Sequence, residues 1–184
     1  MMRELAEMAW IGKDDVFDLS NTVTLGGSPD GSGDIDFFTD VGLTATWRIR
    51  TQARDLATLR LDTLIALRSL VRAALDAADR EIRLPKPVRE SLNNLSVGAP
   101  VVLTLDAHGH LVTTDTAADA QGRIARKVLQ LFVQSQASVV VRRCLAPSCG
   151  MFFQPRRTDQ AWCTTRCGTR ARAARYREAR AATT

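Results

Sequence analysis

Four cysteines lie close together near the end of the chain, in the stretches CLAPSCG and WCTTRCGTR. They are Cys144, Cys149, Cys163 and Cys167, and no cysteine precedes them. Their spacing, C-x4-C-x13-C-x3-C, supplies two pairs of sulfur atoms, and two pairs can occupy the corners of a tetrahedron around one metal ion. Four thiolates are a ligand set of structural zinc sites, so the cluster predicts one structural Zn²⁺.

Each cysteine pair lies in a segment suited to chelation. Pro147 and Gly150 predict a turn around the first pair, with Gly150 adopting a positive φ beside the metal. Cys163 and Cys167 are four residues apart and would lie on one face of a helix. A small aromatic core is expected from Phe152, Phe153 and Trp162. A module of about 40 residues rarely folds on such a core alone, so the metal is expected to stabilise it.

Other chemistry of four thiols stays open at this point. Two disulfides would need an oxidising compartment, but the N-terminal stretch MMRELAEMAWIGKDD lacks the apolar core of a signal peptide and favours the reducing cytoplasm. An iron–sulfur cluster or a rubredoxin-like iron would use the same thiolates. A zinc site that releases its ion on oxidation is a further alternative. A catalytic zinc is disfavoured because four thiolates leave no open coordination position.

Charge is distributed unevenly along the chain. The whole protein has a formal net charge of +5. From Arg142 onward there are ten arginines and two acidic residues, whereas the residues before it comprise fifteen basic and eighteen acidic side chains. An acidic body followed by a strongly basic tail indicates an anionic partner, most often nucleic acid.

The basic tail directly follows the last cysteine. The run GTRARAARYREARAA predicts a helix when its start is anchored. Arginine suits bidentate contacts with phosphate and guanine, so we expect this helix to contact DNA, although RNA offers similar chemistry. The alternative is that the arginines only offset the negative charge of zinc bound to four thiolates. The candidate nucleic-acid contacts are Arg156, Arg157, Arg166, Arg170, Arg172, Arg175, Arg177 and Arg180.

The cysteine stretches resemble a known family. CLAPSCGMFF followed by WCTTRCGTRARAARYR is similar to the bacterial CGNR-type zinc finger, in which W-C-x3-C-G-N-R and a basic helix follow a first cysteine pair. The resemblance implies that the zinc ligands are Cys144, Cys149, Cys163 and Cys167. Thr169 stands where the family has asparagine. That departure bears on base readout and not on zinc binding.

A second resemblance concerns the residues before the finger. FDLSNTV at 17–23 and LRSLVRAAL at 67–75 are similar to a domain called a putative stress-induced transcription regulator, which usually precedes this finger. It implies a bacterial DNA-binding regulator and names no signal. Asn21, Arg68 and Arg72 are candidate ligand-binding or structural residues in these stretches. As structural residues, Asn21 would cap a turn and the arginines would lie on a solvated helix face.

Hydrophobic periodicity predicts a mainly α-helical fold with a small β hairpin or sheet. The strongest helix signal runs from Arg54 to Arg83. Shorter helices are expected at 88–95 and 117–135, and Thr39 or Asp40 should begin another. The expected division is a helical regulatory or dimerisation domain at 1–138, followed at 139–184 by the zinc finger and its basic helix.

Pro100 to Asp115 predicts the hairpin, because two runs of β-forming residues flank the turn DAHGH. His108 and His110 in that turn could in principle bind a metal. Two histidines at a hairpin tip are more often solvated turn residues, so we do not count them among the metal ligands.

These features favour a transcription regulator that binds DNA through the finger and its arginine-rich helix. No nucleophile elbow, phosphate loop or metal-hydrolase motif is present, so we do not expect an enzyme. No apolar run reaches the length of a membrane span. The body would sense a small-molecule effector or form a homodimer, which would suit a palindromic operator. The alternative is a zinc-stabilised protein-interaction or redox-sensing module without specific DNA binding.

Overall fold

The computed structural model describes residues 10–25, 33–116, 119–134 and 141–182. Within these ranges the chain is mainly helical with small antiparallel sheets, as predicted. The helices are α2 (Asp15–Ser20), η1 (Phe37–Thr39, a 3-10 helix), α3 (Val41–Arg50), α4 (Arg54–Ala57), α5 (Leu61–Asp79), α6 (Lys86–Val97), α7 (Ala120–Gln134) and α8 (Thr165–Ala181). The paired strands are β1 (Val23–Thr24) with β2 (Ile35–Asp36), β3 (Val101–Leu105) with β4 (Leu111–Asp115), and β5 (Arg142–Arg143) with β6 (Phe152–Phe153).

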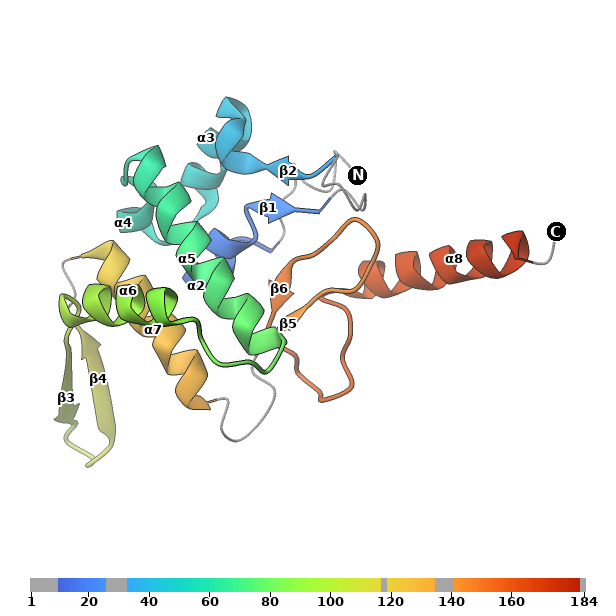
Figure 1. The fold of residues 1–184 in the computed structure, drawn as a ribbon. Helices are drawn as coiled ribbons and strands as arrows, with labels where there is room; N and C mark the ends of the chain where they lie inside the picture. The colour runs from blue at the N-terminus through green and yellow to red at the C-terminus, as the bar shows by residue number, and fades with distance from the viewer. Residues whose placement is uncertain (1–9, 26–32, 117–118, 135–140, 183–184) are drawn as a thin grey trace.

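Residues 10–134 are called the body below. Its hydrophobic core forms around α5, which lies at the centre of this part of the fold (Figure 1). Apolar residues recur along α5 at steps of three and four, so that one face of the helix is buried. That face packs against α2, α6 and α7. Packing between helices therefore stabilises the body, with core side chains that include Leu19, Trp47, Leu56, Leu75, Leu92 and Ile124.

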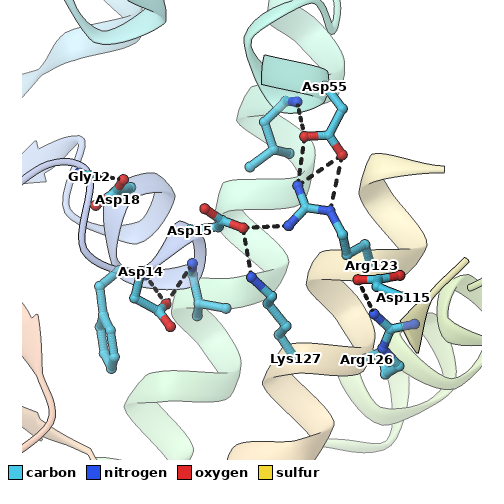
Figure 2. Close-up of polar contacts among 12 residues, drawn as sticks. Gly12, Asp14, Asp15, Asp18, Asp55, Asp115, Arg123, Arg126 and Lys127 are labelled. Carbon is cyan, nitrogen blue, oxygen red and sulfur yellow. Dashed lines mark hydrogen bonds and ion pairs between the residues drawn. The ribbon is translucent and has the colours of Figure 1, made fainter. Parts of the chain in front are cut away.

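Ion pairs add a polar connection between three helices of the body (Figure 2). Arg123 on α7 lies between Asp15 on α2 and Asp55 on α4, with its Nη2 2.7 Å from Asp55 Oδ1. Lys127 on the next turn of α7 donates to Asp15 Oδ2 at 2.7 Å. Burial alone would raise the pKa of Asp15, but the hydrogen bonds from Lys127 and Arg123 outweigh it and hold that pKa below its usual value. The pairs fix α2 and α4 on α7.

The predicted helix from Arg54 to Arg83 is wrong in its extent. The chain breaks it into α4 and α5, and Arg60 adopts an extended conformation at the start of α5. Arg48 on α3 stabilises the break, because its guanidinium group donates to the carbonyl oxygens of Ala57 and Leu59. Leucines continue at helical spacing through the break, so periodicity alone does not reveal it.

The predicted hairpin is present as β3 and β4, and it projects from the body (Figure 1). Gly109 forms the turn with a φ of +79°, which costs glycine no steric strain. His108 and His110 are exposed at the tip, where Asp106 Oδ1 accepts hydrogen bonds from both of their backbone N–H groups. The histidines therefore belong to the turn, as expected.

The last part of the chain forms the finger, defined here as residues 141–164, and then α8. Figure 1 shows α8 extending away from the body. The expected domain boundary between residues 138 and 139 lies outside the described residues. Among the helices that the structure describes, none has the length and apolarity needed to cross a membrane.

Candidate metal centre

Cys144 and Cys149 lie in the turn that joins β5 to β6. The backbone N–H of Cys144 donates to Met151 O at 2.8 Å, and that of Cys149 donates to Ala146 O at 3.2 Å. Gly150 has the positive φ that was expected beside the metal, at +63°. This tight turn brings the two sulfur atoms within 4.8 Å of each other.

Cys163 and Cys167 complete the group from the start of α8. The expectation that both lie on the helix holds only for Cys167, because Cys163 precedes its first residue. Thr164 caps the helix, its Oγ1 accepting a hydrogen bond from the N–H of Cys167 at 3.2 Å. The N–H of Cys163 donates to Cys144 Sγ at 3.4 Å, so the two pairs are already joined by a hydrogen bond.

The four sulfur atoms lie within 4.8 Å of one another, and the three separations among Cys149, Cys163 and Cys167 match those of zinc ligands. Cys163 Sγ lies 3.5 Å from Cys167 Sγ and 3.7 Å from Cys149 Sγ, and the sulfur atoms of Cys149 and Cys167 are 3.8 Å apart. A tetrahedron with zinc–sulfur bonds of about 2.3 Å has edges of about 3.8 Å. A disulfide bond is only about 2.05 Å long, and all four cysteines are free thiols. Donor type and spacing therefore fit one tetrahedral zinc ion.

The surroundings of two of the sulfur atoms, those of Cys167 and Cys144, favour thiolate, the form that binds zinc. A hydrogen bond with Cys144 raises the pKa of both Cys149 and Cys163. Hydrogen bonds with Cys144, Cys149 and Cys163 hold the pKa of Cys167 well below its usual value. The guanidinium of Arg170 lies beside the same sulfur, with Nη2 3.4 Å from Cys167 Sγ. A hydrogen bond with Cys149 lowers the pKa of Cys144 to about 7. Arg170 thus offsets part of the negative charge of the site, the role weighed above as the alternative for all the arginines.

Apolar residues support the metal site on the side of α8. Phe153 and Trp162 pack against the cysteines together with Ala171, as predicted for the two aromatic residues. Gly168 lies against the indole ring, since a Cβ there would come 3.1 Å from Trp162 Cδ1. A side chain at this position would therefore require the indole ring to shift by a few tenths of an ångström. Phe152, expected in the same small core, packs instead in the core of the body.

Asn21 connects the finger to the body. Its Nδ2 donates to Phe152 O at 2.9 Å and its Oδ1 accepts from Phe152 N at 2.8 Å, so the side chain pairs with β6 as a neighbouring strand would. The N–H of Leu25 donates to Cys149 O at 3.2 Å. Leu25 also lies against Gly150, where a Cβ would come 2.4 Å from its side chain. Residues adjacent to the zinc ligands therefore contact the body directly.

Arg68 and Arg72 do not lie on a solvated face of α5, contrary to expectation. Arg68 is 5% exposed, and its Nη2 lies 2.6 Å from Asp36 Oδ2, which ties β2 to α5. Arg72 donates to Ser20 O at 2.6 Å and lies 5.2 Å from the centre of the Phe152 ring. Burial lowers the pKa of Arg72 to about 10. Both arginines stabilise the fold, and Arg72 also holds the finger.

Arg143 makes contacts with α5 and Phe152 that the sequence pattern did not indicate. It lies 5.2 Å from the centre of the Phe152 ring, its N–H donates to Asp79 Oδ1 at 2.9 Å, and its Nη1 lies 3.1 Å from Asp76 Oδ1. Counting charges assigned Arg143 to the basic tail. In the structure it attaches β5 to the end of α5, and only the two acidic residues on α5 could have indicated this.

The candidate nucleic-acid contacts divide into two groups. Arg156 and Arg157 are exposed in the loop before Cys163, and Arg157 Nε lies 3.3 Å from Asp159 Oδ1. The others follow α8, whose first two turns bury Cys167 and Ala171. Helical periodicity places one stripe of arginines on the opposite face. This stripe consists of Arg166, Arg177 and Arg180, whereas Arg170 is partly buried beside Cys167 Sγ.

The remaining arginines of α8, Arg172 and Arg175, lie on its other sides and are exposed. Arg172 Nη2 lies 3.1 Å from Thr169 Oγ1. Thr169 in turn donates to Thr165 O at 3.2 Å, one helical turn earlier. The residue that replaces the family's asparagine therefore positions a neighbouring arginine.

Two family profiles match the chain, in the order in which the structure places the body and the finger. The CGNR zinc finger profile covers residues 141–180, which include the four cysteines and most of α8. The ABATE profile, described as a putative stress-induced transcription regulator, covers residues 15–135. Among curated proteins, none matches this sequence. The four cysteines are thus a structural zinc site of the CGNR type, and the chain belongs to the ABATE family of putative stress-induced transcription regulators.

Proposed function

We propose that the chain regulates transcription by binding DNA and that α8 contacts the duplex. The position and charge of α8 support this proposal. The helix carries six arginines and one glutamate, begins at the zinc site and extends away from the body (Figure 1). Its start is held by Cys167, a zinc ligand, whereas residues 175–182 are exposed.

The dimensions of α8 suit a DNA groove. Its 17 residues correspond to about 25 Å of helix, and the major groove, about 12 Å wide, admits an α-helix. The arginine stripe lies opposite the face that packs on the finger, so it can meet phosphates while the zinc site supports the helix from behind. The zinc ion, when bound, supplies a fixed anchor and no reaction chemistry.

The salt dependence of DNA binding tests the proposal. If about five arginines neutralise phosphates, log affinity should fall against log salt with a slope of about −4.5. Arg177 and Arg180 lie in the exposed half of α8, and the variants Arg177→Gln and Arg180→Gln each remove one of these charges. Each should weaken binding to all sequences and reduce the slope by about 1, because each removes one phosphate contact.

Fluorescence anisotropy with a labelled duplex, at about 50 and about 200 mM salt, gives the slope. Arg89→Gln removes the same charge from an exposed position on α6 and should leave it unchanged. If the slope of log affinity against log salt were the same for all variants, α8 would not be the part of the protein that contacts DNA. No binding at the lower salt concentration would contradict DNA binding and favour an acidic protein partner.

A further inference from the structure

The β3–β4 hairpin has an apolar face that nothing in the described part of the chain covers. Leu103, Leu105 and Leu111 are 60%, 69% and 66% exposed, and the strand register places all three on one face. Val102 and Val112 on the other face are exposed as well. A hairpin of two strands is marginally stable in water on its own, and additional strands or a packed face are needed to stabilise it.

The base of the hairpin, in contrast, is firmly attached to the body. Arg126 on α7 pairs with Asp115 at the end of β4 (Figure 2). Arg126 also donates to Ala99 O at 2.6 Å. Thr116 Oγ1 donates to Pro100 O at 3.0 Å and closes the two ends. The hairpin is therefore an arm with a fixed base, and its uncovered parts are the leucine face and the outer edge of β3.

The outer edge of β3 presents backbone groups that another strand could pair with. Asp106 N–H donates to His110 O at 3.0 Å across the hairpin, and hydrogen-bonded pairs alternate along an antiparallel ladder. Val102 and Thr104 therefore pair with β4. The groups that point outward belong to Val101, Leu103 and Leu105. No described strand pairs with this edge, and VVLTL has neither a charge nor a proline, the residues that usually protect an exposed edge.

We propose that β3 pairs antiparallel with β3 of a second copy of this chain, forming a four-stranded sheet about a two-fold axis at Leu103. In this register Leu103 lies opposite Leu103 of the second copy, and Val101 lies opposite Leu105. Each outward N–H meets an outward C=O, which satisfies the edges of both copies. The leucine faces join into one apolar surface that crosses the axis.

The composition of the two strands favours a second copy of this chain as the binding partner, and β3 rather than β4 as the strand that pairs. Pairing about a two-fold axis places residues of one strand opposite residues of the same strand, and in β3 every such pair is uncharged. The same pairing through β4 would place Asp115 opposite Leu111, although Asp115 is already bound to Arg126. Self-complementarity is what a symmetric interface requires, and β3 has it.

Sedimentation velocity of the zinc-loaded full chain, from about 1 to about 100 μM, tests the proposal without nucleic acid. The wild type should be a dimer at the upper end of this range. Leu103→Lys places two like charges together at the axis and removes a leucine pair, so the dissociation constant should rise about 100-fold. Thr113→Lys adds the same charge opposite Leu103 on β4, away from the axis, and should leave the dimer intact.

Charge reversal separates loss of pairing from misfolding. Leu103→Glu alone should also be monomeric, whereas an equimolar mixture of L103K and L103E should form heterodimers because opposite charges then meet at the axis. A wild type that stays monomeric throughout the concentration range would overturn the proposal. The leucine face would then be a binding surface for a different protein. A dimer that survives Leu103→Lys, or a mixture that does not associate, would overturn it equally.

Discussion

Asp18 shows at the scale of one residue how the fold shifts the chemistry of a side chain. It is 1% exposed, and its Oδ2 accepts a hydrogen bond from Gly12 N at 2.7 Å (Figure 2). Burial disfavours the charged carboxylate and raises the pKa of Asp18 to about 6, although the Gly12 N–H opposes this shift. Between about pH 4 and about pH 6 the folded protein therefore holds a proton here that the unfolded chain, with an aspartate pKa of about 3.9, has already lost.

The raised pKa of Asp18 predicts how stability depends on pH. Because the folded state binds the proton more tightly, the contribution of Asp18 to stability falls as pH rises between about 4 and about 6. From about pH 5 to about pH 7, the wild type should lose about 1 kcal/mol of unfolding free energy relative to Asp18→Asn. Urea unfolding of both proteins at the two pH values measures this difference, in which the pH dependence of zinc binding cancels.

Asp62→Asn is the matched control for this measurement, because Asp62 is exposed on α5 and its pKa is lowered to about 2 by a hydrogen bond from Arg60. It should show no such difference in the same pH window. If Asp18→Asn differed from the wild type by the same amount at both pH values, a raised pKa for Asp18 would be ruled out.

Residue types and spacing predicted the four zinc ligands because each cysteine pair is local in sequence and thiolates have specific chemistry. The residues that attach the finger could not be assigned in the same way. Asn21 binds Phe152, which lies 131 residues away, and Arg143 binds Asp79, which lies 64 residues away. Nothing in the sequence around Asn21 or Arg143 indicates that their hydrogen-bond partners lie so far away in the chain.

At the scale of elements, β6 joins the finger to the body. Its first residue, Phe152, packs in the body core beside Arg72 and Arg143, while Phe153 packs with the cysteines. Alternation along an extended strand explains this division, since successive side chains point to opposite sides. The two halves of the protein therefore share a strand of two residues and are expected to stabilise each other.

Asn21→Ala tests this connection between α2 and β6. The variant removes two hydrogen bonds and leaves the buried N–H and C=O of Phe152 without partners, so the unfolding free energy should fall by about 2–4 kcal/mol. Urea unfolding of the zinc-loaded protein measures the change. Asn94→Ala, at an exposed position on α6, should change it by no more than about 0.5 kcal/mol. Equal stability of the two variants would show that the finger does not depend on Asn21.

Elements with strong local signals were the ones that sequence predicted well. The hairpin and the helix after Cys167 have turn residues and composition that act over a few positions. The break between α4 and α5 depends instead on Arg48, which reaches two carbonyl oxygens from a different helix. Tertiary contacts of this kind override periodicity and are not visible in a local pattern.

At the scale of the whole molecule, the zinc site lies between the body and α8. On one side Cys149 O accepts a hydrogen bond from Leu25 of the body, and on the other Cys167 lies in the first turn of α8. The composition of the chain predicted an acidic body and a basic tail, but not that the metal ligands would contact both. One zinc ion that gathers both cysteine pairs would therefore fix the direction in which the arginine-rich helix leaves the body.

The affinity of the reduced protein for duplex DNA, measured while zinc is added to metal-free protein, tests this claim most directly. We predict weak binding without metal, and binding at least about tenfold tighter that saturates at one zinc ion per chain, because an anchored helix has less disorder to lose. Cys163→Ser, which lacks one ligand, should stay weak. Equal affinity with and without zinc, or full affinity of Cys163→Ser, would contradict the claim that the zinc site positions α8.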